Sequence, residues 1–300
     1  MPSPVVLIAT NDPDYSEKLR QCALNIVPDV DWVLPGDKAA LGASVAACWY
    51  PQSDLVTQYP ALRCLHSVGA GSDNLGSLLN SDLEVRRIVD QEQKVGMFEY
   101  ILWGILYYQR DMDRYLTAQN SRRWQAFHQR RACDTRVGIL GLGEIGGYVA
   151  CRLAEMGYQV SGWSRTAKRL SGVQSYSGVN GVNTMLDELD ILVNLLPLNE
   201  QTEGILNRDL LSRLPNRAAL IHSGRGAQLV EQDLIDLLHN EQLRGSILDV
   251  FAIEPLSESS KLWSMDKVLV TPHIASSASI PQIVRQISAT ASEFAQQENR

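Results

Sequence analysis

The stretch Gly141-Leu142-Gly143-Glu144-Ile145-Gly146 follows the apolar segment 136–140 and precedes segment 148–156, whose apolar residues are spaced as on a helix. A strand, a glycine-rich turn and a helix start form the dinucleotide-binding fingerprint. In this fingerprint the first glycine makes the tight turn, the second lets the backbone approach the pyrophosphate, and the third lets the helix pack closely on the strand. We therefore predict that residues 141–146, with Glu144 and Ile145 at the helix start, bind a dinucleotide.

The loop after the next strand bears on which dinucleotide binds. That strand, 158–162, ends in Trp163-Ser164-Arg165-Thr166, where no Asp or Glu stands. An NAD-type site has an acidic residue there to hold the ribose hydroxyls. Ser164 and Thr166 offer hydroxyls instead, and Arg165 and Lys168 offer positive charges that suit a phosphate. The loop is either a solvated basic segment or a 2′-phosphate site; we favour the latter, hence NADP (NADPH), with NAD as a weaker cofactor.

The bulk composition indicates a globular protein of about two domains. The chain has 300 residues, of which 45% are hydrophobic and 20% charged, and its net charge is −7. This charge argues against nucleic acid or an anionic membrane surface as the main partner. The five cysteines are scattered without a CxxC pair, so we expect neither a disulfide framework nor a metal site. The first residues lack a signal-peptide pattern, and we expect a cytoplasmic location.

The position of the fingerprint in mid-chain predicts a separate domain before it. Strand and helix patterns alternate there, as in parallel α/β proteins. The longest helical run, 97–119, is expected to cross into the nucleotide domain, and the arginine-rich segment 120–134 to be a solvated excursion. We predict an α/β fold with two Rossmann-like or flavodoxin-like doubly wound parallel-sheet domains and an active-site cleft between them. The discontinuous substrate-binding domain would comprise residues 1–97 plus 277–300, and the NADP-binding Rossmann domain residues 98–276.

Three polar residues follow later strands. Arg225 lies in a Gly-Arg-Gly turn, Glu254 precedes a proline, and His273 follows one. Each has a plain structural interpretation by itself, but strand ends of a parallel sheet meet at its ligand-binding edge. Reduction of a 2-keto acid needs a hydride, which NADPH supplies, a proton and a group that holds the carboxylate. A protonated His273 can donate the proton, Glu254 can favour its charged form, and Arg225 can pair with the carboxylate.

In this order the motifs resemble the D-isomer-specific 2-hydroxyacid dehydrogenase family over essentially the whole chain. The resemblance is carried by residues 141–146, Leu195-Leu196-Pro197, Gly224-Arg225-Gly226, residues 248–255 and residues 271–275. It implies that Arg225, Glu254 and His273 are catalytic and that Asp249 lies beside the nicotinamide carboxamide. It also implies a homodimer through the long helix after Met97, and cofactor contacts from Leu196, Pro197, Ser223 and Gly224.

The turn Val68-Gly69-Ala70-Gly71 is also similar to that family. Small residues at a strand end let consecutive backbone N–H groups face one anion, so we expect this turn to bind the substrate carboxylate, with a plain βα turn as the alternative. Cys48-Trp49-Tyr50-Pro51 and the loop 163–166 resemble the glyoxylate/hydroxypyruvate reductases of the bacterial A type within the family. That resemblance implies that Trp49 lines a pocket for a small substrate; a core position at a strand end is equally compatible.

The expected function is therefore NADPH-dependent reduction of glyoxylate to glycolate and of hydroxypyruvate to D-glycerate. A larger or phosphorylated 2-keto acid is one alternative, and it would need further cations such as Arg63, Arg86 or Arg87. A catalytically silent NAD(P)-sensing binding protein is another, although a sensor need not retain all three catalytic side chains. One departure from the family is His222, three residues before Arg225, where these enzymes commonly carry Asn. This departure bears on the hydrogen bonding of the arginine turn and not on the role of Arg225 itself.

Overall fold

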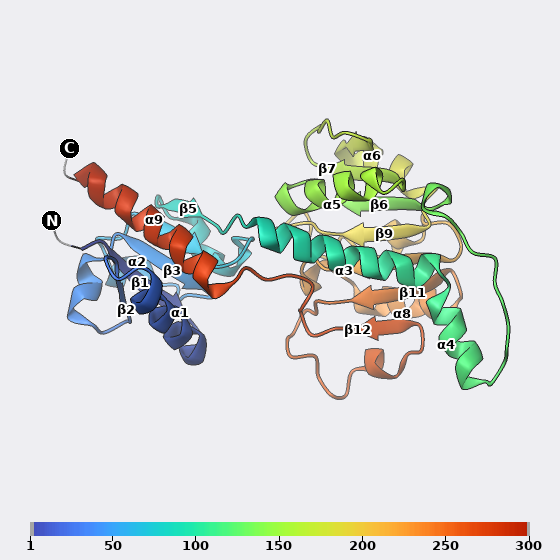
Figure 1. Ribbon diagram of the computed structural model, residues 1–300, viewed down its shortest axis with the longest axis horizontal. Helices are drawn as coiled ribbons and strands as arrows, with labels where there is room; N and C mark the ends of the chain where they lie inside the picture. Colours follow the sequence, from blue (N-terminus) through green and yellow to red (C-terminus); the bar gives the residue numbers. More distant parts are fainter. Residues whose placement is uncertain (1–2, 299–300) are drawn as a thin grey trace. The chain divides into compact units, whose positions relative to one another are not determined.

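The computed structural model describes residues 3–298 and divides into two compact units (Figure 1). Unit 1 comprises the chain up to Glu92 and again from Ser277, and unit 2 runs from Gln93 to Ser276. Each unit is a parallel β-sheet with helices on both faces, so the prediction of two doubly wound α/β domains is confirmed. Among the described residues, no helix has the length and apolar character needed to cross a membrane.

Unit 1 is built on five parallel strands in the order β2-β1-β3-β4-β5. The strands are β1 (Val5–Thr10), β2 (Asp31–Val33), β3 (Val45–Trp49), β4 (Cys64–Ser67) and β5 (Glu84–Arg86). Helices α1 (Pro13–Ile26) and α9 (Ile280–Glu298) cover one face; η1 (Lys38–Gly42), α2 (Leu55–Gln58) and η2 (Asp73–Asn80) cover the other. Because both faces are covered, β3 and β4 are buried along nearly their whole length and do not alternate between apolar and polar residues.

The two ends of the described chain pack together in unit 1. Helix α1 begins where the Asp12 carboxylate accepts the N–H groups of Asp14 and Tyr15, and Pro13 occupies the first turn. The last helix, α9, packs against α1, and its Ile283, Val284 and Ile287 side chains lie in one apolar cluster with strands β1 and β3. The C-terminal segment therefore completes the core of unit 1.

Unit 2 contains seven parallel strands in the order β12-β11-β10-β9-β6-β7-β8. They are β6 (Arg136–Leu140), β7 (Gln159–Ser164), β8 (Val173–Ser177), β9 (Ile191–Asn194), β10 (Ala218–His222), β11 (Leu243–Leu248) and β12 (Val268–Val270). Helices α3 (Gln91–Gln109) and α5 (Glu144–Glu155) pack on one face; α6 (Gly178–Leu186), α7 (Arg208–Leu211) and α8 (Glu231–His239) pack on the other. Short helical turns are η3 (Ala132–Asp134), η4 (Gly226–Gln228) and η5 (Lys261–Ser264). The strand order reverses between β6 and β9, and ligands of Rossmann folds bind at that point.

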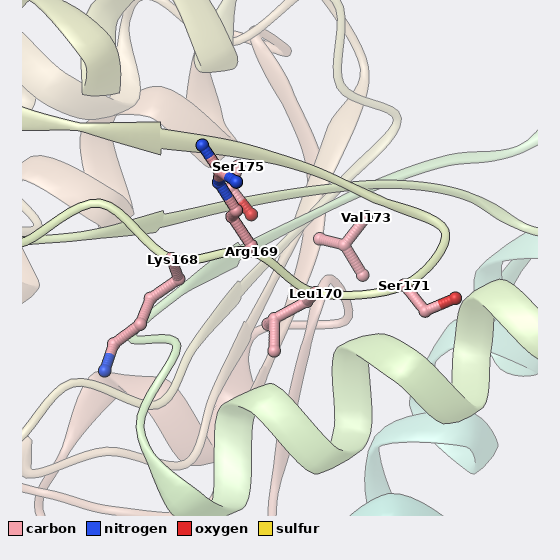
Figure 2. A pocket seen from close by; sticks show the side chains of 6 residues that line it. All are labelled: Lys168, Arg169, Leu170, Ser171, Val173 and Ser175. Carbon is pink, nitrogen blue, oxygen red and sulfur yellow. The ribbon is translucent and has the colours of Figure 1, made fainter.

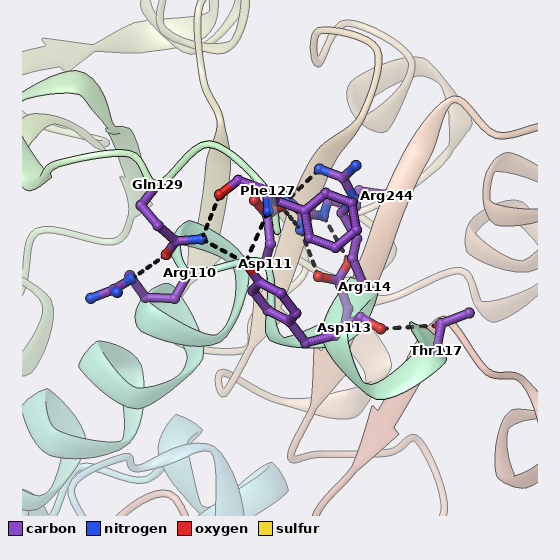
Figure 3. A network of polar contacts seen from close by, with 9 residues as sticks. Arg110, Asp111, Asp113, Arg114, Thr117, Phe127, Gln129 and Arg244 are labelled. Atoms are coloured by element: carbon purple, nitrogen blue, oxygen red, sulfur yellow. Dashed lines mark hydrogen bonds and ion pairs between the residues drawn. The ribbon is translucent and has the colours of Figure 1, made fainter. Parts of the chain in front are cut away.

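One prediction was wrong, because the helix expected over 97–119 is two helices. Helix α3 ends at Gln109 and α4 (Met112–Asn120) begins after Asp111, whose φ of 57° is left-handed. The cause is distant in sequence: the Arg244 guanidinium, from β11, donates to the carboxylates of Asp111 (2.5 Å) and Asp113 (2.6 and 2.7 Å) (Figure 3). A left-handed conformation costs a non-glycine residue about 1–2 kcal/mol. These charge-assisted hydrogen bonds, largely shielded from solvent, offset that cost.

Candidate active site

The glycine turn after β6 has the close approaches that its sequence predicts. Gly141 has a left-handed φ of 101°, and a Cβ at this position would lie 2.8 Å from the Leu195 carbonyl oxygen. A Cβ on Gly146 would lie 1.8 Å from the Gly141 carbonyl oxygen, so α5 reaches the turn only with glycine there. No heavy atom lies within 4 Å of the Cβ position of Gly143, which caps α5. An open backbone at a helix N-terminus suits a pyrophosphate.

The first residues of α5 differ in their surroundings. Glu144 is exposed and forms an ion pair with Lys94, with 2.6 Å between Nζ and Oε2. Ile145 is half-buried and packs against the apolar cluster beneath α3 and α5. Both residues lie in the first turn of the helix, where backbone N–H groups have no intrahelical acceptor.

The loop after β7 begins with a fixed residue and continues with exposed ones. Ser164 is buried, and its hydroxyl donates to the Thr166 carbonyl oxygen (2.8 Å). Arg165 and Thr166 are exposed. Within residues 3–298, Arg165 forms no ion pair. Its guanidinium is therefore available for an anion at the end of β7.

Further along this loop, Lys168 and Arg169 border a shallow pocket of about 510 Å³, which Ser171 and Ser175 also line (Figure 2). Neither cation forms an ion pair in the described part of the chain. Arg169 lies beside Ser175, and Lys168 points to another side of the loop, so each cation can donate to a phosphate separately. These unpaired cations are what the predicted 2′-phosphate site requires, and a solvated basic segment would leave them unpaired as well.

A buried polar network joins the arginine turn to the turn after β9. The Asn194 amide donates to Nδ1 of His222 (3.1 Å) and to Oε1 of Gln228 (2.8 Å). Gln228 also accepts the Arg225 N–H (2.9 Å) and donates to the Leu196 carbonyl oxygen (3.1 Å). Burial lowers the pKa of His222 to about 4, so its ring is neutral near pH 7 and accepts at Nδ1. His222, which departs from the family pattern, therefore belongs to the hydrogen-bond network that holds this turn.

The other residues predicted to contact the cofactor lie at the same edge of the sheet. Leu196 is buried and Pro197 is exposed, with its carbonyl oxygen accepting from Gln228 (3.0 Å). A Cβ on Gly224 would lie 2.3 Å from Oε1 of Gln228 and 2.8 Å from Nδ2 of Asn194, so a larger residue would displace side chains of the buried network. The Ser223 hydroxyl is buried and has no hydrogen-bond partner among the described residues. Buried polar groups in folded proteins are nearly always paired, so this hydroxyl calls for a ligand or water.

His273 and Glu254 form a hydrogen-bonded pair, with 2.8 Å between Nδ1 and Oε2. The second carboxylate oxygen, Oε1, accepts the Phe251 N–H (2.9 Å). The hydrogen bond from Glu254 raises the pKa of His273 against the opposing effects of burial and of the Arg225 charge. Burial alone would raise the pKa of Glu254, but the hydrogen bonds from His273 and Phe251 and the nearby positive charges lower it. The surroundings thus favour the charged forms of both partners.

Arg225 stands at the start of η4, beside this pair. The arginine is half-buried, and its Nη1 donates to the Gly224 carbonyl oxygen (2.9 Å). Its charge acts on the pKa values of both Glu254 and His273. The structure thus brings the three predicted catalytic side chains together within unit 2.

Asp249 holds the turn that carries His273. Its Oδ1 accepts from the Thr271 hydroxyl (2.7 Å) and the Ile274 N–H (2.8 Å), and its Oδ2 accepts from the Ala275 N–H (2.9 Å). The Asp249 carbonyl oxygen accepts the His273 N–H (2.9 Å), and His273 has a left-handed φ of 54°. Asp249 is 1% exposed. The structure thus shows that this carboxylate holds the turn, and its place beside the nicotinamide carboxamide, which the family resemblance implied, stays a prediction.

Asn194 and Gln228 are the residues that sequence reasoning missed. Both are buried, and both connect turns that contain predicted site residues. The sequence does contain a signal for both residues: Asn194 is a polar residue at the end of the otherwise apolar strand β9, and Gln228 is a polar residue in the first turn after Arg225. A buried amide needs its hydrogen bonds satisfied, so such a position indicates a network.

In unit 1, the predicted anion-binding turn follows β4. The Val68 N–H donates to the Cys48 carbonyl oxygen and the Gly69 N–H donates to the Ser67 hydroxyl, each at 3.1 Å. The N–H groups of Ala70 and Gly71 donate to no acceptor within the described residues. Two of the four predicted N–H groups are therefore used by the fold, and two are available to a ligand.

Trp49 ends β3 next to this turn. It is half-buried, packs against the core cluster of α1 and α9, and stacks edge-on with Tyr50 at 5.1 Å between ring centroids. One of its ring carbons lies 3.1 Å from the Cβ position of Gly69, so the indole also contacts the anion turn. Trp49 therefore packs against the core, as one interpretation of its sequence position expected, and its place in a substrate pocket stays a prediction.

Two of the three arginines considered for a second anionic group have other partners. Arg86 forms ion pairs with Glu84 (2.5 Å) and Glu293 (2.7 Å). The Arg63 guanidinium lies 5.0 Å from the centre of the Phe294 ring. Arg87, by contrast, reaches the turn, because its Nη1 donates to the Ala70 carbonyl oxygen (3.0 Å).

Comparisons with known proteins agree with this fold and site. The family described as D-isomer specific 2-hydroxyacid dehydrogenase, NAD binding domain, matches residues 102–275. The chain is 35% identical over 248 residues to glyoxylate/hydroxypyruvate reductase A of Yersinia enterocolitica. The aligned region covers 80% of this chain and 79% of the relative. The chain belongs to the D-isomer specific 2-hydroxyacid dehydrogenase family.

Solved structures of family members superimpose along nearly the whole chain. A D-isomer specific 2-hydroxyacid dehydrogenase family protein from Klebsiella pneumoniae 342 is 41% identical, with a TM-score of 0.93, over 99% of this chain and 96% of that one. The NADPH-dependent glyoxylate/hydroxypyruvate reductase of Sinorhizobium meliloti, solved with NADP and sulfate, is 31% identical. Its TM-score is 0.86, over 98% of this chain and 95% of that one.

Proposed function

We propose that this dehydrogenase catalyses the NADPH-dependent reduction of small 2-keto acids, glyoxylate to glycolate and hydroxypyruvate to D-glycerate. The observation that carries the proposal is the pair formed by His273 and Glu254, 2.8 Å apart and beside Arg225 at the ligand-binding edge of a Rossmann sheet. The Yersinia enterocolitica relative carries this activity in its name, and the Sinorhizobium meliloti relative was solved with NADP.

The residues present fit NADPH. Gly141 and Gly146 leave the turn before α5 free of side chains, so its backbone would hold the pyrophosphate. Arg165 and Lys168 would hold the 2′-phosphate at the end of β7. The unpartnered Ser223 hydroxyl lies at the same edge and would bind the cofactor there. When bound, the reduced nicotinamide supplies a hydride to the carbonyl carbon of the acid.

The protein side chains supply the proton and the charge stabilisation. His273 donates a proton from Nε2 to the keto oxygen, because Nδ1 is engaged by Glu254. Glu254 orients the ring and favours its protonated form. Arg225 pairs with the carboxylate and polarises the carbonyl. Asp249 acts as a positioning residue, because its three accepted hydrogen bonds fix the turn that carries His273.

The mechanism predicts a pH dependence that Glu254 controls. Reduction requires protonated His273, so kcat/KM is full at low pH and is lost as the pH rises through the raised pKa of His273. In Glu254→Gln the main cause of that raised pKa is absent, so the alkaline limb moves to lower pH, toward the unperturbed value of about 6.5. Rates of both proteins from pH 5 to 9 measure the shift, with Glu258→Gln, an exposed carboxylate nearby, as the control. Coincident alkaline limbs would contradict the assignment.

The function itself is tested by NADPH and NADH oxidation with glyoxylate, hydroxypyruvate, pyruvate and a bulkier 2-keto acid. We expect fast turnover of glyoxylate and hydroxypyruvate with NADPH. In Arg165→Ala the KM for NADPH rises about tenfold while that for NADH is unchanged, because only NADPH carries the 2′-phosphate. The exposed Arg213, replaced by alanine, is the matched control.

Other outcomes of that assay have definite meanings. Activity only on bulky acids would overturn the small-substrate assignment, and activity only with NADH would overturn the role of Arg165. Tight NADPH binding without turnover of any acid would favour the nucleotide-sensing alternative.

We also propose that the protein is a homodimer through α3 and α4. Trp103, Leu106 and Leu116 leave apolar surface exposed along these helices. Trp124 is fully exposed in the arginine-rich segment that follows. Exposed apolar side chains gathered on neighbouring helices are typical of a subunit interface.

A further inference from the structure

Three consecutive peptide groups in the turn 69–71 are held through their carbonyl oxygens. The donors are the Ile88 N–H to Gly69 (3.0 Å), Nη1 of Arg87 to Ala70 (3.0 Å) and the Ser67 hydroxyl to Gly71 (2.6 Å). The Ser67 hydroxyl is itself fixed, because it accepts from the Gly69 N–H and the Asn74 amide, both at 3.1 Å. The turn is therefore held from its carbonyl side by β4 and by the segment after β5.

Peptide planarity carries this restraint to the N–H groups. In a trans peptide the carbonyl oxygen of one residue and the N–H of the next point in opposite directions. Holding the three carbonyls therefore directs the N–H groups of Ala70, Gly71 and Ser72 to the other side. These three N–H groups donate to no acceptor within residues 3–298. Ser72 thus adds a donor beyond the stretch 68–71 that the sequence singled out.

We propose that Arg87 is a positioning residue for the substrate carboxylate. By holding the Ala70 carbonyl, it keeps the Gly71 N–H directed at the anion. Its guanidinium contacts the carbonyl side of the turn, opposite the free N–H groups, so it acts through the peptide rather than as a direct ligand. The inference rests on the proposed function, because the anion is taken to be the carboxylate of a 2-keto acid.

The neighbouring arginine offers a matched control. Arg86 carries the same charge one residue earlier, but it pairs with Glu84 and Glu293 and does not contact the turn. Arg86→Met and Arg87→Met each remove one positive charge from the same segment. An effect of overall charge would be equal in the two variants, whereas positioning through the Ala70 peptide would be confined to Arg87→Met.

Two ligands separate positioning from direct contact. Glyoxylate has one carboxylate and oxalate has two, so a direct ion pair between Arg87 and a second carboxylate would affect oxalate alone. We expect Arg87→Met to raise both the KM for glyoxylate and the Kd for oxalate, measured by calorimetry with NADPH present, about fivefold. In Arg87→Met the kcat and the KM for NADPH should stay at wild-type values. In Arg86→Met these two constants, the KM for glyoxylate and the Kd for oxalate should all stay at wild-type values.

Several results would overturn the proposal. These are equal constants in the two methionine variants, a change confined to oxalate, and a wild-type protein that does not bind oxalate. If Arg87→Met fails to fold, Ser67→Ala tests the same restraint on the next peptide and should raise the two constants alike; unchanged constants there would also overturn it. A wild-type protein that binds oxalate but does not turn over any keto acid would refute the proposed function, while the oxalate affinities would still test Arg87.

Discussion

In His273→Ala we expect kcat for glyoxylate reduction to fall by about 10²–10⁴-fold, the usual contribution of a positioned general acid. In the proposed mechanism the ring is the proton donor, and its Nδ1 is held by Glu254 at 2.8 Å. The affinity for NADPH should persist, because the glycine turn and the loop after β7 are untouched. Single-turnover rates and a fluorescence titration with NADPH measure the two quantities separately.

A second histidine controls for this experiment. His239 lies exposed at the end of α8, away from the strand ends that carry the site. His239→Ala should keep wild-type turnover and wild-type NADPH affinity. Unchanged turnover in His273→Ala would refute the role of the imidazole, and loss of NADPH binding would show that the ring supports the cofactor site instead.

Gly146→Ala should impair both stability and cofactor binding. Its Cβ would lie 1.8 Å from the Gly141 carbonyl oxygen, a backbone atom that no side-chain rotation can remove. Helix α5 must therefore shift away from the turn, which by analogy with overpacked cores costs about 1–3 kcal/mol. The same shift moves the N–H groups that, in the proposed site, would face the pyrophosphate. We expect a lower melting temperature and a Kd for NADPH raised at least about tenfold.

Two other glycines separate these effects. No heavy atom lies within 4 Å of the Cβ position of Gly143 or Gly42, and neither has a left-handed φ. Gly143→Ala should therefore keep its stability and lose affinity for NADPH, because the added methyl group faces the pyrophosphate. Gly42→Ala, in unit 1, should change neither property. A Gly146→Ala protein with wild-type affinity for NADPH would refute the packing argument.

The features that sequence predicted well depend on local patterns. Buried parallel strands appear as short apolar runs, and the glycine pattern that predicts the turn lies within residues 141–146. A general rule predicted that Arg225, Glu254 and His273 lie close together, because parallel strands end at one edge of their sheet. The alternation of strands and helices was likewise enough to predict two doubly wound sheets.

The features that sequence missed depend on contacts between distant residues. The break between α3 and α4 requires Arg244, from β11, beside Asp111 and Asp113. Helical periodicity gives no sign of it, because the residues on either side are suited to a helix. The hydrogen bonds that Asp249 accepts from a turn more than 20 residues later depend on the pairing of β11 with β12, which no local pattern in the sequence indicates.

The hydrogen bonds of Asp249 and Phe251 have a consequence for how the enzyme tolerates change. Glu254 accepts a hydrogen bond from the Phe251 N–H, and the His273 N–H donates to the Asp249 carbonyl oxygen. Both partners are therefore positioned by residues 249–251, directly after β11. The intervening residues 256–267 do not set the spacing between acid and carboxylate. The exposed residues 257–259 of that connection can therefore accept an insertion or a label while the predicted proton donor keeps its place.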